Sequence, residues 1–81
     1  MATREEVTDQ IKQILVQQLG IDEDQVTLKA SFQQDLDADS LDLVELIMEL
    51  EDQFDIKITD EEAQKISTVG EAVDYVMAHQ S

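Results

Sequence analysis

Three Thr-x-x-Glu sequences constrain the fold of this chain more than any other feature. They run from residues 3 to 6, 59 to 62 and 68 to 71. In such a capping box, the Thr hydroxyl accepts a hydrogen bond from the first turn of a helix, and the Glu carboxylate accepts one from the capping N–H. The boxes therefore predict that helices begin at residues 4, 60 and 69.

The spacing of apolar residues extends these starts into helices and adds one more. Val7, Ile11, Ile14 and Leu15 recur at helical spacing, so residues 4–19 are predicted as a helix that Gly20 ends. Further helices are predicted over residues 40–54, 60–65 and 69–78. No segment is long enough to form a sheet on its own. We therefore expect an all-α fold in one domain over residues 1–81: a small four-helix bundle with three longer helices and one short helix.

Residues 21–38 lack helical periodicity and are predicted to be a long loop between the first and second helices. Unanchored loops of that length are uncommon in compact domains. We therefore expect its apolar residues to fasten it to the core, namely Val26, Leu28, Phe32 and Leu36.

The helix predicted over residues 40–54 has more apolar residues than one buried face needs. At roughly 100° per residue, one group falls on a single core face: Leu43, Leu46, Ile47, Leu50 and Phe54. Leu41, Val44 and Met48 form a second apolar stripe that points away from that face. Carboxylates border the stripe, so it is either a partner-binding surface or a face that another element covers.

Composition narrows the classes of function. Twenty Asp and Glu residues against five Lys and Arg residues give a net charge of −15. This charge disfavours nucleic acid and anionic membranes, and favours a monomer that binds basic protein surfaces. The absence of Cys excludes disulfides, thiolate metal sites and a cysteine nucleophile. We expect no membrane span and no signal peptide.

An enzyme is not expected, and no catalytic residue is assigned. The single histidine, His79, lies near the end of the chain, where we expect a solvated residue in a frayed tail. No Ser–His arrangement is evident from the sequence.

A calcium loop is the other chemistry to consider, because Asp35-x-Asp37-x-Asp39 resembles the start of an EF-hand. That loop needs Gly at its sixth position and a bidentate Glu at its twelfth. Ser40 and Leu46 occupy these positions, so no metal site is expected.

The sequence Asp39-Ser40-Leu41 opens the acidic, leucine-rich helix, with Asp39 as the predicted N-cap and the Ser40 hydroxyl facing outward. It resembles the prosthetic-group site of the acyl carrier protein family. The resemblance covers nearly the whole chain and includes the segments 30–32, 44–46, 52–54 and 58–63. One departure is visible, because many members have Gly where this chain has Asp37. Asp rather than His before Ser40 argues against a peptidyl carrier.

The resemblance implies a carrier of the free-standing type used in fatty acid synthesis. A phosphopantetheinyl transferase would attach 4'-phosphopantetheine from coenzyme A to Ser40, and the thiol of that arm would hold growing fatty acyl chains as thioesters. The expected partners are synthases, reductases, dehydratases and acyltransferases with basic patches. The expected location is the bacterial cytoplasm or the plastid stroma.

Family analogy also implies two groups of site residues. The partner-binding residues would be Asp39, Leu41, Asp42, Val44, Glu45, Met48 and Glu51. The residues of an acyl pocket would be Phe32, Leu46, Leu50, Ile58, Ala63, Ile66 and Ala72. Three alternatives stay open: a carrier specialised for polyketides or other acyl groups, an acidic adaptor that is never modified, and an EF-hand-like calcium-binding protein.

Overall fold

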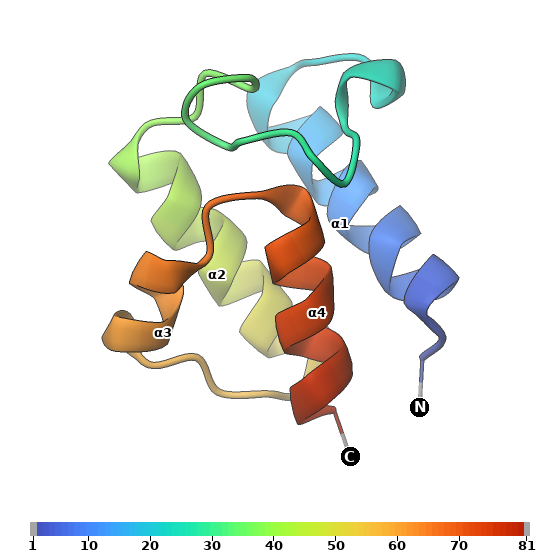
Figure 1. Ribbon diagram of the computed structural model, residues 1–81, viewed down its shortest axis with the longest axis vertical. Coiled ribbons are helices and arrows are strands. Elements are labelled where there is room, and N and C mark those ends of the chain that lie inside the picture. The colour runs from blue at the N-terminus through green and yellow to red at the C-terminus, as the bar shows by residue number, and fades with distance from the viewer. Residues whose placement is uncertain (1, 81) are drawn as a thin grey trace.

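Four α-helices make up the fold, in a computed structural model that describes residues 2–80 (Figure 1). They are α1 (Arg4–Leu19), α2 (Ser40–Phe54), α3 (Asp60–Lys65) and α4 (Val69–His79), with a short 3₁₀ turn, η1 (Glu23–Gln25), after α1. Within residues 2–80 there is no strand, only an isolated bridge between Ser31 and Thr68. The all-α prediction is confirmed, and α4 ends one residue later than expected, at His79 rather than Ala78.

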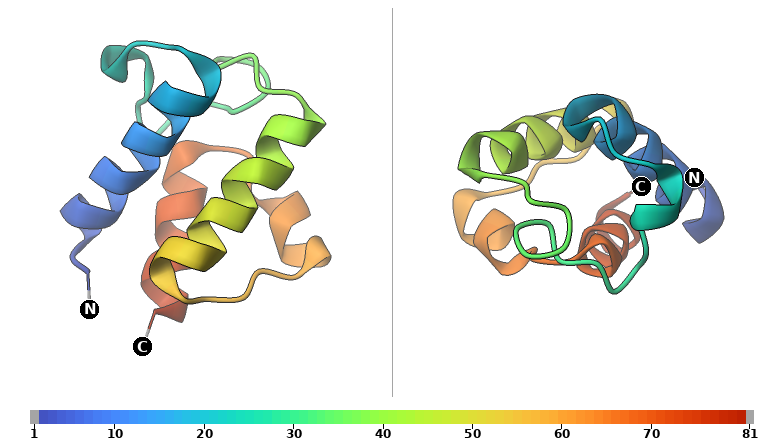
Figure 2. Two further views of the ribbon diagram at one scale, coloured as in Figure 1. Left: turned by 180° about the vertical axis from the view of Figure 1, so that it is seen from behind. Right: turned by 90° about the horizontal axis from the view of Figure 1, so that it is seen from above.

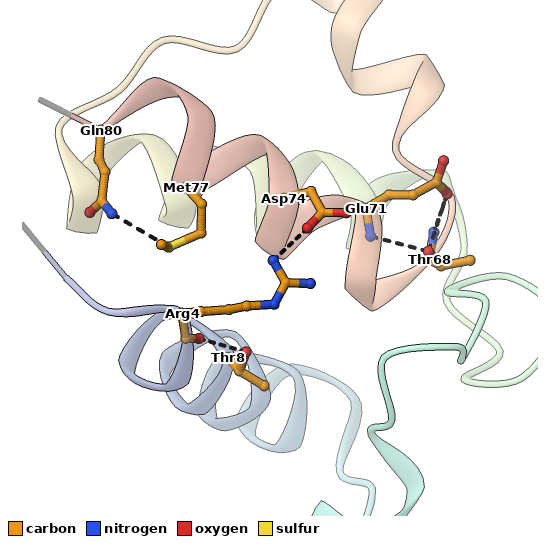
Figure 3. Close-up of polar contacts among 7 residues, drawn as sticks. All are labelled: Arg4, Thr8, Thr68, Glu71, Asp74, Met77 and Gln80. Carbon is orange, nitrogen blue, oxygen red and sulfur yellow. Dashed lines mark hydrogen bonds and ion pairs between the residues drawn. The ribbon is translucent and has the colours of Figure 1, made fainter.

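The capping boxes at Thr3 and Thr68 form as predicted. The Thr3 hydroxyl accepts the Glu6 N–H at 3.2 Å, and the Glu6 carboxylate accepts the Thr3 N–H at 3.2 Å. Figure 3 shows the equivalent pair of Thr68 and Glu71 at the start of α4. Satisfied N–H groups at these positions fix where α1 and α4 begin.

The predicted box at Thr59 is only half formed. Thr59 accepts the Glu62 N–H at 3.2 Å, but the Glu62 carboxylate accepts a hydrogen bond from the Tyr75 hydroxyl instead of reaching back to the cap. Burial, followed by this hydrogen bond, raises the pKa of Tyr75 to about 12. The expectation of a full box was therefore wrong, because a phenol on α4 takes the carboxylate and ties α4 to α3.

His79 is exposed, as predicted, but it does not lie in a frayed tail. It belongs to the last turn of α4 and stacks on Tyr75, with ring centroids 3.9 Å apart and the planes within 11° of each other. Its Nδ1 lies 2.9 Å from the Tyr75 carbonyl oxygen. The i, i+4 spacing of the two residues brings them together on one face of the helix.

One core holds the three longer helices together. α1 contacts both α2 and α4, and Figures 1 and 2 show it running antiparallel to each of them. The large side chains with almost no exposed surface come from all three helices and the long loop: Val7, Ile11, Leu15, Phe32, Leu46, Leu50, Val69, Val73 and Val76. Because burial of each such side chain contributes roughly 1.5–3 kcal/mol, this cluster is the main source of stability.

Polar contacts join the two ends of the chain. The side chain of Gln80 accepts the Ala2 N–H at 2.9 Å and donates to the Ala2 carbonyl oxygen at 2.7 Å. Arg4 pairs with Asp74 at 2.5 Å, but both side chains are at least half exposed, so this pair adds little stability (Figure 3). Ala2 and Gln80 therefore lie together, and the start of α1 and the end of α4 are at the opposite end of the bundle from the long loop (Figure 1).

The loop over residues 20–39 crosses the end of the bundle where α1 stops and α2 starts (Figure 2). Gly20 has the predicted left-handed conformation, with φ of 66°. Val26, Phe32 and Leu36 are buried as expected, whereas Leu28 is 44% exposed, which corrects the prediction that it anchors the loop.

Leu28 contributes its backbone to loop anchoring instead of its side chain. Its carbonyl oxygen accepts the Gly70 N–H at 2.8 Å, and the Ala30 carbonyl oxygen accepts the Val69 N–H at 3.0 Å. A Cβ atom at Gly70 would lie 2.8 Å from the Leu28 oxygen. Glycine therefore permits the close approach that fastens the loop to the first turn of α4.

Candidate functional site

Ser40 is the first residue of α2, and a reciprocal pair of carboxylates fixes its position. Asp39 Oδ1 accepts the Asp42 N–H at 2.9 Å, and Asp42 Oδ2 accepts the Asp39 N–H at 3.2 Å. Asp39 is thus the N-cap, as predicted, within a capping box that the sequence patterns did not identify. Ser40 is exposed, and its hydroxyl has no hydrogen-bond partner among the residues that the structure describes. The hydroxyl is therefore free to react at the start of a helix.

Asp37, in the loop before Ser40, is the position at which this chain departs from the Gly of many acyl carrier proteins, and its backbone conformation accounts for that Gly. Asp37 has φ of 57°, in the left-handed region that glycine adopts most easily. Asp is among the residues that enter this region at reduced cost. The substitution of Asp for Gly at this position therefore keeps the turn that leads into α2.

The second apolar stripe of α2 is not covered by another element within residues 2–80. Leu41 is 72% exposed, Val44 54% and Met48 62%. Glu45, which borders them, accepts a hydrogen bond from Gln18 Nε2 on α1 at 2.8 Å. Of the two explanations that the sequence left open for the stripe, the structure therefore excludes burial in the fold.

The other acidic residues assigned to partner binding differ in exposure. Asp39 is exposed, whereas Asp42 and Glu51 are half-buried. Glu51 Oε2 accepts the Ile58 N–H at 2.9 Å, so this carboxylate is already engaged within the fold.

An open cavity of about 640 Å³ lies between α2, α3 and the long loop, and Ser40 lines it. Residues on its wall include most of those that the sequence assigned to an acyl pocket: Phe32, Leu46, Ile58, Ala63 and Ile66. The structure places the remaining two, Leu50 and Ala72, in the core with no exposed surface and not on the cavity wall.

Two wall residues that sequence reasoning assigned only to the core face are Leu43 and Ile47. Both are half-buried. Ser40, Ile47 and Glu51 are spaced by seven and four residues, which places them on one line along α2. This line lies between the core face and the exposed stripe of α2, and that position on the helix is the sequence signal that could have identified these residues as part of the cavity wall.

A second, more open hollow of about 730 Å³ lies at the C-terminal end of α2. Its wall is mainly acidic and includes Glu49, Asp52 and Asp55. Among residues 2–80, no group of three or more His, Cys, Asp or Glu side chains is arranged to hold a metal ion.

Comparison with known proteins places these features in a family. The family model for the phosphopantetheine attachment site matches residues 9–76. An acyl carrier protein from Rubrobacter xylanophilus is 62% identical over 78 residues, which is 96% of each chain. The chain belongs to the acyl carrier protein family. A solved structure of an acyl carrier protein from Enterococcus faecalis is 44% identical, with a TM-score of 0.84 over 98% of this chain and 100% of that one.

Membership confirms the resemblance seen in the sequence and defines the chemistry. The prosthetic group is phosphopantetheine, and the chain is a carrier rather than a catalyst. The residues present fit such a group, because a free hydroxyl on an exposed helix start borders an open, largely apolar cavity. Within residues 2–80, none of the helices has the length and apolar character needed to cross a membrane.

Proposed function

We propose that Ser40 is the attachment residue and that the chain carries fatty acyl groups as thioesters during fatty acid synthesis, in the bacterial cytoplasm. The observation that supports Ser40 most strongly is its free, exposed hydroxyl on the wall of the cavity, within the residues that the family model matches. The other serines in that matched region, Ser31 and Ser67, have side-chain oxygens in hydrogen bonds with Gln34 and Glu71.

The chemistry at Ser40 is the transfer of the 4'-phosphopantetheinyl group from coenzyme A. The Ser40 oxygen loses its proton and forms the new P–O bond, while adenosine bisphosphate leaves with the electrons of the broken P–O bond. The attached group supplies a thiol, which this chain lacks because it has no Cys. The N-terminus of α2 favours a negatively charged phosphate at this position through its helix dipole and free N–H groups.

We propose that the exposed stripe and its carboxylates are the docking face for partner enzymes. The residues are Asp39, Leu41, Asp42, Val44, Glu45, Met48 and Glu51. Exposed apolar side chains would supply contact area, and the surrounding negative charge would steer basic surfaces toward Ser40. The partners are the transferase that modifies Ser40 and the synthases, reductases, dehydratases and acyltransferases of fatty acid synthesis.

We also propose that the cavity shelters the acyl chain. Ser40 lines this cavity together with five apolar residues: Phe32, Leu46, Ile58, Ala63 and Ile66. An apolar chain that enters such a cavity leaves water, which is favourable by roughly 25 cal/mol for each Å² removed from solvent.

The test is to incubate the chain with coenzyme A, Mg²⁺ and a phosphopantetheinyl transferase. Intact mass and a thiol titration then report the product. Wild type should gain one pantetheine group and one thiol per molecule, whereas Ser40→Ala should gain neither. Ser67→Ala is the matched control, because Ser67 also lines the cavity, and it should react as wild type does. Modification of Ser40→Ala would refute the proposal.

A further inference from the structure

Glu51 holds the connection between α2 and α3 in place. Its Oε2 accepts the Ile58 N–H at 2.9 Å, seven residues along the chain, and the bond is partly buried. Its backbone oxygen also accepts the Ile56 N–H at 3.3 Å. Glu51 therefore binds the segment that leads into α3 through both its side chain and its backbone.

This contact lies at the far end of the cavity from the attachment residue. Ser40 and Glu51 both line the cavity, on the same line along α2. Glu51 comes eleven positions after Ser40, which corresponds to roughly 16 Å along the helix at 1.5 Å per residue. Ile58, the residue that Glu51 fixes, is itself an apolar part of the wall and is 8% exposed. The hydrogen bond thus holds a wall residue of the cavity beside the end of α2 that is farthest from Ser40.

The wall on this side depends on such ties. α3 has only six residues, none of them buried, and a helix of this length is not stable by itself. Side-chain hydrogen bonds join α3 and the segment before it to the rest of the fold. The Ile58 N–H donates to Glu51, and the Tyr75 hydroxyl donates to Glu62 and lies 3.1 Å from the Lys57 carbonyl oxygen. The Glu51 bond is the one that holds the backbone N–H of the wall residue Ile58, so its loss would free this residue to move outward.

We propose that Glu51 is a positioning residue that sets the longest acyl chain the cavity shelters, in addition to any contact it makes with partners. This inference rests on the function proposed above. A chain longer than the cavity would have to displace Ile58 and leave its N–H without the Glu51 carboxylate, which is unfavourable for a partly buried group. Shorter chains leave the bond intact.

The experiment compares wild type with Glu51→Gln, Glu51→Ala and the control Glu49→Ala. Gln keeps an oxygen acceptor for the Ile58 N–H but has no charge, whereas Ala has neither. Glu49 is an exposed carboxylate of the same helix whose hydrogen bond, to Gln53 at 3.1 Å, stays within α2. Each protein is first primed at Ser40 and checked by mass, and is then loaded with saturated acyl chains of increasing length.

The rate of thioester hydrolysis without any partner enzyme measures how well each chain is sheltered. In wild type, Glu51→Gln and Glu49→Ala, protection should stop increasing at the same chain length. In Glu51→Ala that limit should shift to longer chains, and the Ile58 amide should exchange its hydrogen about tenfold faster, the effect expected from loss of a charge-assisted bond.

Three outcomes would overturn the inference. The same limit in all four proteins would show that the bond does not set chain length. A Gln variant that behaves as the Ala variant does would assign the effect to charge rather than to the bond. Failure of wild type to take up pantetheine at Ser40 would refute the proposed function and the inference with it, and the mass check identifies that case before the acyl assay begins.

Discussion

The capping box at Asp39 makes a prediction that separates two roles of one carboxylate. Asp39 and Asp42 satisfy each other's N–H groups at 3.2 and 2.9 Å, so Asp39→Ala should leave the Asp42 N–H without its partner. Replacement of an N-cap by Ala costs about 1 kcal/mol, and a shift of that size lowers the melting temperature of a small domain by about 4–8 °C. Asp39→Asn should cost little, since Asn caps a helix as well as Asp does.

The assay combines thermal unfolding by circular dichroism with the rate of priming by the transferase. If the cap fixes the position of Ser40, Asp39→Asn should keep wild-type stability. Its priming rate should fall only by the electrostatic contribution of Asp39, which decreases as salt is added. Asp39→Ala should lose both stability and rate. Equal stability of the Ala and Asn variants would refute the capping argument. Equal rates of wild type and Asn at low salt would remove the proposed steering role of Asp39.

Three further predictions follow from burial and pKa shifts. Leu50→Ala should lower the free energy of unfolding, measured in urea, by about 2–5 kcal/mol, because Leu50 has no exposed surface. Met48→Ala should change it by about 0.5 kcal/mol or less, because Met48 is 62% exposed. Equal losses in the two variants would contradict the assignment of Leu50 to the core face of α2 and of Met48 to the exposed stripe. Hydrogen bonds from Ser67 and Thr68 lower the pKa of Glu71 below its ordinary value of 4.5, so its stabilising contribution should be complete above pH 4.5 and decrease as pH falls through the folded-state pKa. In urea unfolding at a series of pH values, the difference in unfolding free energy between wild type and Glu71→Gln should therefore become smaller in acid. A difference that stays constant with pH would contradict this prediction. The pKa of Tyr75 is raised from 10.0 to about 12, so the contribution of its protonated hydroxyl to stability should be complete below pH 10 and be lost between pH 10 and 12. A Tyr75→Phe variant should not show this loss of stability in alkali. If the variant still shows it, the loss belongs to another group.

Local signals in the sequence were sufficient to predict most of the fold. Thr3 and Thr68 satisfy N–H groups within their own helices, so a four-residue pattern determines where those helices begin. The two faces of α2 follow from helical periodicity alone. Contacts between distant segments could not be predicted in this way. Glu62 is drawn to Tyr75, thirteen residues away, and the loop is fastened by the Leu28 backbone, which no side-chain pattern reveals.

In the candidate site, too, local features could be predicted from the sequence, whereas contacts between distant segments could not. The exposed positions of Ser40 and of the second apolar stripe could be predicted, because both follow from the order of residues in α2. The engagement of Glu51 with Ile58 could not, since it depends on where the chain returns after α2 ends. Leu50 and Ala72 illustrate the same limit, because an apolar residue at helical spacing can line a cavity or fill the core, and only packing decides which.

The central claim is that one hydroxyl, on Ser40, carries the prosthetic group. Purifying the protein after expression with an active transferase, digesting it and locating the modification by tandem mass spectrometry tests that claim most directly. The account predicts phosphopantetheine on the peptide that contains Ser40, with fragment ions that assign it to that serine. Phosphopantetheine on Ser31 or Ser67, or on no residue of a correctly folded protein, would contradict it.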